Sequence, residues 1–157
     1  MPMKKRTLAT FLLLLGALAA APLGLSPAWA IEFKPGQIWS YQTRPGEEAS
    51  KLYLARIDRG LGSRAIFHLY IDGLQLRNPK FHGGVQDHLV HLPISREALE
   101  ASVIQLLQSD AAMPDISEGY ALWLLSFEQG QAGIFTIPVS QALQHIENAF
   151  NAPPPQQ

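Results

Sequence analysis

The chain has 157 residues, and its 12 Lys and Arg nearly balance its 13 Asp and Glu, which gives a formal net charge of −1. It contains no cysteine, which excludes disulfides, thiol nucleophiles and cysteine zinc sites. No basic cluster occurs after residue 30, so nucleic acids and anionic membrane surfaces are poor candidates for a partner.

The first thirty residues have the three-part layout of a secretory signal peptide. Residues 4–6 (KKR) are basic, and residues 8–21 are almost wholly Leu and Ala. Ala28 and Ala30 then supply the small side chains that signal peptidase requires, so cleavage is expected before Ile31.

An uncleaved membrane anchor is the alternative, because the uncharged run 7–31 is long enough to span a bilayer. Pro22, Gly24 and Pro27 disfavour a spanning helix in its last third. We therefore expect a periplasmic or secreted protein that leaves the membrane after cleavage. Its mature chain of 127 residues, with nine Lys and Arg against 13 Asp and Glu, carries a net charge of −4 and suffices for one domain.

Three strands are predicted next, over residues 37–43, 51–57 and 65–71, because apolar and polar residues alternate there and aromatic and β-branched residues are frequent. The glycine-marked segments 44–48 and 58–62 read as turns. Short loops between consecutive strands favour an antiparallel meander.

The second half of the mature chain predicts one loop, two further strands and three helices. Ser95 and Ser117 are expected to cap the first two helices, Gly130 to end the second, and Pro138 to lie in the first turn of the third. The predicted elements are a loop 79–87, a strand 88–94, a helix 96–108 with Leu99, Val103 and Leu106 on one side, a helix from Ser117 with Tyr120, Trp123, Leu124 and Phe127 on one side, a strand 132–137, and a helix with Val139, Leu143, Ile146 and Phe150 on one side.

Strands followed by helices, rather than strict alternation, indicate an α+β domain over residues 31–150. The expected architecture is an antiparallel sheet of about four to five strands with two to three helices packed on one face. The late strand should insert beside an early one, and residues 151–157 (NAPPPQQ) are expected to be a disordered tail.

Four segments carry a family resemblance: FKPGQIWSYQTRPGEEASKLYL, IDGLQLRNP, HLPISREAL and EGYALWLLSFEQGQAGIFTIPV. They resemble a family of small exported bacterial proteins known as uncharacterised open reading frames. The pattern W-x-Y-x-T-R-P-G-E-E is its sharpest element, and the resemblance runs from about Phe33 to Phe150. It implies one fold unit and assigns no residue roles.

The best candidate metal ligands are His82, His88 and His91, with Asp87 among them. His88 and His91 are three residues apart in a predicted strand, so their side chains should point to opposite faces. We therefore expect no metal site and no cofactor.

No nucleophile motif is present, because Ser63 follows Gly62 without the frame of a nucleophile elbow. Glu47 and Glu48 are adjacent in one turn, where they cannot face each other across a sugar as glycosidase carboxylates do. A solvated turn with weak pairing to Arg44 is the expected arrangement. No catalytic residue is therefore assigned.

The sequence favours a non-catalytic binding protein of the cell envelope: an inhibitor, an immunity-type protein or an accessory subunit that recognises another protein. The alternatives are a small envelope hydrolase and a small-ligand carrier. Aromatic residues such as Trp39 and Trp123 are expected in the core rather than in a ligand groove. The candidate binding surface consists of Arg44, Glu47, Glu48, Lys80 and His82.

We predict that protein recovered from the cell envelope begins at Ile31, because Ala28 and Ala30 end a proline-broken apolar run. Intact-mass measurement of that material checks the prediction. A full-length mass in the membrane pellet would contradict both the cleavage and the expected location.

Overall fold

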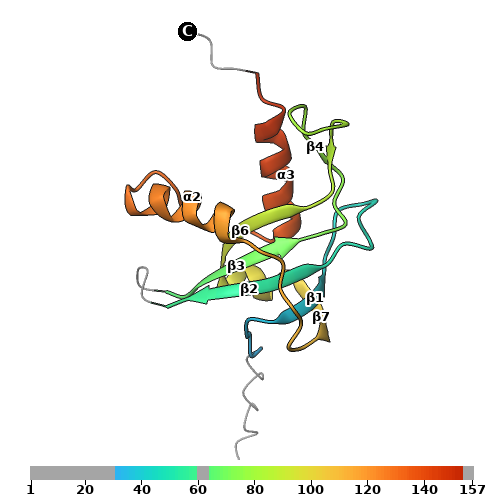
Figure 1. Ribbon diagram of the computed structural model, residues 1–157. Coiled ribbons are helices and arrows are strands. Elements are labelled where there is room, and N and C mark those ends of the chain that lie inside the picture. Colours follow the sequence, from blue (N-terminus) through green and yellow to red (C-terminus); the bar gives the residue numbers. More distant parts are fainter. Residues whose placement is uncertain (1–30, 60–63, 154–157) are drawn as a thin grey trace, which may run out of the picture. The chain divides into compact units, whose positions relative to one another are not determined.

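The computed structural model describes residues 31–59 and 64–153 (Figure 1). The predicted signal peptide 1–30, part of the predicted turn 58–62 and the end of the predicted tail, 154–157, lie outside these ranges. The described residues form a five-stranded antiparallel sheet, a two-stranded sheet and three helices. The predicted α+β class is confirmed.

The five-stranded sheet has the order β6-β3-β2-β1-β7. Its first three strands form the predicted antiparallel meander. β6 extends the sheet beside β3, and β7 closes its other side beside β1. The strands are β1 (Gln37–Tyr41), β2 (Leu52–Asp58), β3 (Ile66–Ile71), β6 (Leu89–Ser95) and β7 (Val103–Gln108).

A short second sheet forms around the predicted loop 79–87. β4 (Leu76–Arg77), which precedes that segment, pairs antiparallel with β5 (Val85–Gln86), which lies within it. Phe81 and Gly84 close the connection through backbone hydrogen bonds, in which Phe81 N donates to Asn78 O and Gly84 N donates to Phe81 O. The connection is thus a hydrogen-bonded turn.

The main core lies between one face of the large sheet and two helices, α1 (Arg96–Glu100) and α3 (Val139–Phe150). Ser95 caps α1 as predicted, its hydroxyl accepting from Ala98 N at 3.2 Å. Burying each large aliphatic side chain contributes about 1.5–3 kcal/mol relative to leaving it exposed. The core includes Leu52, Leu54, Phe67, Leu69, Leu92, Ile94, Leu99 and Leu143.

The remaining helix, α2 (Ser117–Glu128), covers the opposite face and lies over β6 and β3 in Figure 1. Its Tyr120 and Trp123 rings each lie 5.0 Å from the ring of His68 on β3. The prediction that the helices pack on one face therefore holds for α1 and α3 and not for α2. The reason is the alternation of β3: Phe67 and Leu69 enter the main core, so His68 projects to the other side and is buried there.

The predicted helix 96–108 is wrong beyond its first turns. α1 ends at Glu100, and Val103–Gln108 form strand β7 along β1. Leu99, Val103 and Leu106 fit a helical period, but the free edge of β1 offers these residues a backbone partner that an isolated segment lacks. Tertiary pairing overrides the local pattern.

The predicted strand 132–137 is also wrong, because only one parallel bridge forms, between Ile94 and Phe135. Phe135 N donates to Pro93 O, and Ser95 N donates to Phe135 O, each at 2.9 Å. The next rung toward Gly133 would need an N–H from residue 93, which is a proline. The other direction runs into α1, so the ladder stops after one rung.

The later helices begin and end close to their predicted positions, but the expected cap of α2 by Ser117 is wrong. Ile116 is the N-cap residue, Ser117 is the first residue of the helix, and no side chain caps it. Gly130 follows α2 with φ +70°, as predicted for the residue that terminates it. Pro138 precedes α3, and Val139 N donates to the Ser102 hydroxyl at 2.9 Å, which supplies the cap that proline lacks. Among the described residues, no helix has the length and hydrophobicity needed to cross a membrane.

We predict that Trp123→Ala lowers the free energy of unfolding by about 3–5 kcal/mol, because it truncates a buried aromatic side chain of α2. Glu48→Ala, on the exposed turn, should change it by no more than about 0.5 kcal/mol. Urea denaturation of the domain measures both. Equal midpoints for the two variants would mean that α2 contributes no packing energy.

Candidate functional site

The predicted binding surface contains a buried ion network. Glu47 is only 2% exposed, and its carboxylate accepts hydrogen bonds from the Arg44 guanidinium and from Gln75 N. Arg44 also donates to Glu147 of α3 at 3.1 Å. The expectation of a solvated turn with weak pairing is therefore wrong for Glu47, because the turn folds back onto α3.

Glu147 joins this network to β4. Arg77 donates to it twice, from Nε at 3.0 Å and from its backbone N at 3.2 Å. Burial would raise the pKa of Glu147, but the bonds from Arg77 and Arg44 outweigh it and lower the pKa. Glu47 and Glu147 are both held as hydrogen-bonded carboxylates, which makes the network a structural clasp between the 44–50 turn, β4 and α3.

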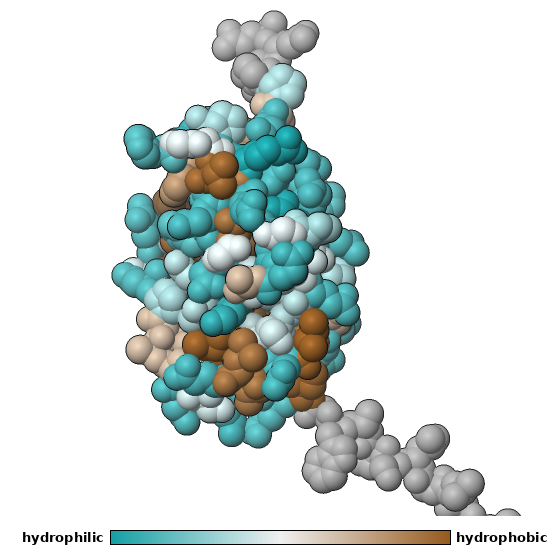
Figure 2. Space-filling model, turned by 90° about the vertical axis from the view of Figure 1, so that its right-hand side faces the viewer, coloured by the Kyte–Doolittle hydropathy of each residue, from teal (hydrophilic) through white to brown (hydrophobic). Residues whose placement is uncertain are grey.

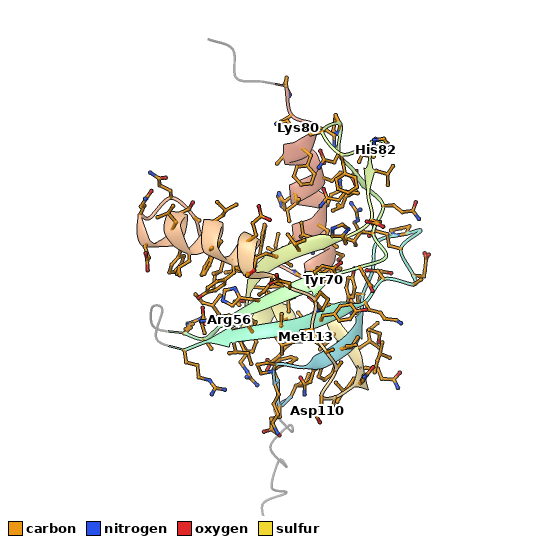
Figure 3. All side chains as sticks on the ribbon, in the orientation of Figure 1. Arg56, Tyr70, Lys80, His82, Asp110 and Met113 are labelled. Atoms are coloured by element: carbon orange, nitrogen blue, oxygen red, sulfur yellow. The ribbon has the colours of Figure 1, made fainter. Side chains whose placement is uncertain are left out.

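The other three residues of the predicted surface are exposed. Glu48 accepts a hydrogen bond from Gly46 N at 2.8 Å within the turn. Lys80 and His82 lie at the end of the connection between β4 and β5 (Figure 3). The five residues thus divide into an ion pair of the partly buried Arg44 with the buried Glu47, and three solvated side chains.

The histidines considered as metal ligands do not converge. His88 Nδ1 lies 2.6 Å from the neighbouring Asp87 carboxylate, His82 is exposed, and His91 contacts His68 instead. Within residues 31–59 and 64–153, no group of three or more His, Cys, Asp or Glu is placed to hold a metal ion.

The structure brings together a polar cluster that sequence reasoning did not single out, between the sheet and α2. Its centre is His68, which is fully buried. His68 Nδ1 lies 2.9 Å from His91 Nε2, and the two ring planes are nearly parallel, at 14°, with their centres 5.1 Å apart. On the other side, His68 Nε2 lies 3.2 Å from Asp58 Oδ2. That contact is close without being aligned as a hydrogen bond.

Asp58 is held by two stronger partners. Arg56 Nε donates to Oδ1 and the Tyr120 hydroxyl donates to Oδ2, each at 2.6 Å. Burial would raise the pKa of Asp58, but these two hydrogen bonds help to lower it. The Arg56 guanidinium also lies 4.4 Å from the centre of the Tyr120 ring. The Asp58 carboxylate and this cation–π contact together connect α2 to β2.

The two imidazoles have strongly lowered pKa values. Burial lowers the pKa of His68 to about 4, partly opposed by the charge of Asp58. Burial, and then the proximity of His68, lower the pKa of His91 to about 4. Both rings are therefore neutral at pH 7.

This arrangement can hold and share protons, but it offers a substrate little access. Tyr120 and Trp123 cover the ring of His68, and Gly119 packs so closely on His91 that a Cβ there would lie 2.7 Å from His91 Cβ. The nearest hollow lies beside the cluster, at Arg56 and Tyr120, and is lined mainly by residues 113–117. The cluster therefore ties α2 to the sheet.

A different feature of the fold is open to solvent: the outer edge of β7. Ile104, Leu106 and Leu107 are 66%, 38% and 45% exposed. The register with β1 skips Ile104 and Leu107, so both lie at β-bulges, which turn side chains outward at an edge. Apolar residues gather at the level of β1 and β7 on the face shown in Figure 2.

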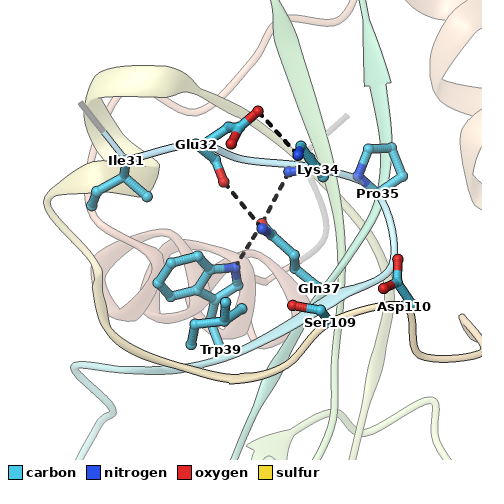
Figure 4. Close-up of a pocket in the computed structure, with 9 residues that line it drawn as sticks. Ile31, Glu32, Lys34, Pro35, Gln37, Trp39, Ser109 and Asp110 are labelled. Atoms are coloured by element: carbon cyan, nitrogen blue, oxygen red, sulfur yellow. Dashed lines mark hydrogen bonds and ion pairs between the residues drawn. The ribbon is translucent and has the colours of Figure 1, made fainter. Parts of the chain in front are cut away.

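A cavity of about 450 Å³ adjoins β7 beside Leu106 (Figure 4). Gln37 organises its wall: its side-chain carbonyl accepts from Lys34 N at 3.0 Å and from Trp39 Nε1 at 3.2 Å, and its amide donates to Glu32 O at 3.0 Å. Asp110, the one non-glycine residue with positive φ in the described chain, closes the cavity on the β7 side.

Comparison of the chain with protein-family models, curated proteins and solved structures finds no match. The family resemblance carried by the W-x-Y-x-T-R-P-G-E-E pattern therefore stays a prediction.

We predict that Glu147→Gln destabilises the domain by about 1.5–3 kcal/mol at pH 7, because it removes a buried charged acceptor from Arg44 and Arg77. The lowered pKa means that this stabilisation is complete above the unfolded value, about 4.3, and is lost as the pH falls through the folded value. The deficit should therefore shrink between pH 7 and pH 3.

Glu100→Gln is the matched control, because Glu100 pairs with Arg96 at 2.9 Å on the surface. Such pairs contribute about 0–1 kcal/mol. Urea denaturation of both variants at the two pH values measures the difference. Equal deficits at pH 7 would refute the role of the buried clasp.

Proposed function

We propose that the mature domain is an exported, non-catalytic binding protein that recognises another protein by pairing the β7 edge with an extended segment of that partner. The observation that carries the proposal is β7 itself, a six-residue edge strand, VIQLLQ, with neither a charged residue nor a proline. Export is supported by the sequence of residues 1–30.

The two edges of the sheet differ in how far they are covered, which supports β7 as the docking edge. The β6 edge is covered by the bridge at Phe135 and interrupted by Pro93. Proteins commonly protect free edges with lysine, proline or a covering segment, because unpaired backbone groups invite another strand. The bulges of β7 limit uncontrolled pairing, while Ile104 and Leu107 leave an apolar surface for a chosen partner.

The cavity beside Leu106 supports recognition of side chains as well as backbone. Strand addition draws affinity from main-chain hydrogen bonds and specificity from pockets that accept alternate side chains. A segment running along β7 would pass the cavity, whose lining includes Trp39, Leu106 and Asp110. The mature charge of −4 further favours a basic partner through faster association.

A library of random twelve-residue peptides displayed on phage provides the probe. Peptides selected on the mature domain should show alternating apolar residues. Their affinity should fall at least about tenfold for the double variant Ile104→Lys, Leu107→Lys, because the two lysines place charge in an apolar contact worth more than about 1.4 kcal/mol. Fluorescence anisotropy of synthetic selected peptides gives the dissociation constants.

Leu122→Lys is the control, because Leu122 is 65% exposed on α2, away from β7. It should leave the affinity unchanged. Methylation of alternate backbone nitrogens of the peptide should weaken binding, since it removes donors for a β ladder. Equal binding by the wild type and the β7 double variant would refute the proposed edge.

A further inference from the structure

The contact between His68 and His91, beneath α2, holds one hydrogen. His68 Nδ1 and His91 Nε2 are 2.9 Å apart, so one nitrogen must carry a hydrogen and the other a lone pair. The position of Asp58 decides which. Its carboxylate oxygen lies 3.2 Å from His68 Nε2, which favours a hydrogen there. His68 Nδ1 is then the acceptor, and His91 Nε2 the donor.

The geometry of the pair opposes protonation of both rings. One added proton on His91 Nδ1 leaves the contact intact, but a second, on His68 Nδ1, would face the hydrogen on His91 Nε2 across 2.9 Å and break it. A charge on either ring would need a counter-ion in a space already enclosed by aromatic rings.

The charged and titratable groups that face the pair offer no free anion. Arg56 and Asp58 come from β2, and Tyr120 comes from α2. The one carboxylate is shared between the Arg56 guanidinium and the Tyr120 hydroxyl. Protonation of both rings would place three cations around it. The lowered pKa values of both histidines agree with this balance.

α2 is the element that can detach from the sheet. β3 and β6 are held by their shared ladder and by the main core. α2 buries only Trp123 and has no side-chain cap at its first turn. Apart from edge-on aromatic contacts and the Arg56 guanidinium over the Tyr120 ring, it is held by two hydrogen bonds: from Tyr120 to Asp58, and from Trp123 Nε1 to Gly133 O at 2.9 Å. Elements with few buried contacts open at the lowest free energy.

We propose that the His68–His91 pair is an acid-operated release for α2: protonation of the two rings detaches α2 from the β3–β6 face while the sheet and the α1–α3 core stay folded. The released rings regain ordinary titration. The detached state therefore binds more protons as the pH falls from about 6.5 toward 4, and its population rises over that window.

Hydrogen exchange of the mature domain tests the release, with rates corrected for intrinsic exchange at each pH. The opening constant of α2 amides, residues 117–128, should rise at least about a hundredfold between pH 7 and pH 4.5. Amides of α3, residues 139–150, should keep their protection. A parallel loss of protection in both helices, or an α2 that stays protected, would overturn the proposal.

His91→Phe keeps an aromatic ring on His68 and removes one titrating group, so the rise in α2 opening should fall at least tenfold. His145→Gln, on α3, is the control and should leave the rise unchanged. If the His91 variant does not fold, nitrogen chemical shifts of the wild-type imidazoles decide the question. His68 and His91 should titrate together with α2 opening. Titration with α2 still protected, or a full pH response in His91→Phe, would refute the release.

Discussion

The double-sided burial of β3 constrains most of the remaining structure. Phe67 and Leu69 face the main core, and His68 faces α2, so both sides of the strand are buried except at the partly exposed Tyr70. A wholly apolar strand would need only apolar side chains packed against each of its sides. A buried imidazole needs polar partners as well, because an unpaired polar group in the interior costs about 1–3 kcal/mol. His91, Asp58 and Tyr120 are placed by that requirement, and through them α2 is fixed on its face.

The strands of the meander were predictable because their burial follows from local alternation. Trp39 and Tyr41 are buried while Ile38 and Ser40, which alternate with them, are partly exposed, which is the pattern the sequence shows. β7 was not predictable in the same way. Its apolar residues suit a helix equally well, and only the free edge of β1, more than sixty residues away in the chain, selects the strand. A nonlocal partner leaves no periodic signal.

The polar clusters could have been anticipated in part. Glu147 is four residues after Leu143 and eight after Val139, which places a carboxylate on the apolar side of α3 and calls for a buried cation. His68 likewise interrupts a largely apolar strand, IFHLYI, and its buried imidazole requires a polar partner. The sequence does not predict which residues pair with Glu147 and His68. Arg44 reaches Glu147 only through the folded turn, and Asp58 reaches His68 only through the bulge in β2. Glu47 and Glu48 show the same limit, since adjacent residues of one turn have opposite environments.

The sheet order separates the two proposed properties of the molecule. β7 lies at one edge, whereas β3 and β6, which carry the histidine pair, lie at the other side with β2 and β1 between them. The ion network of Arg44, Glu47 and Glu147 lies apart from both, between the 44–50 turn, β4 and α3. Protonation of the histidines would thus release α2 without breaking the hydrogen bonds that shape the β7 edge. Recognition at β7 and release of α2 are therefore separable in this fold. Coupling between them would require the sheet itself to change its twist, which the shared ladders of β1, β2 and β3 resist.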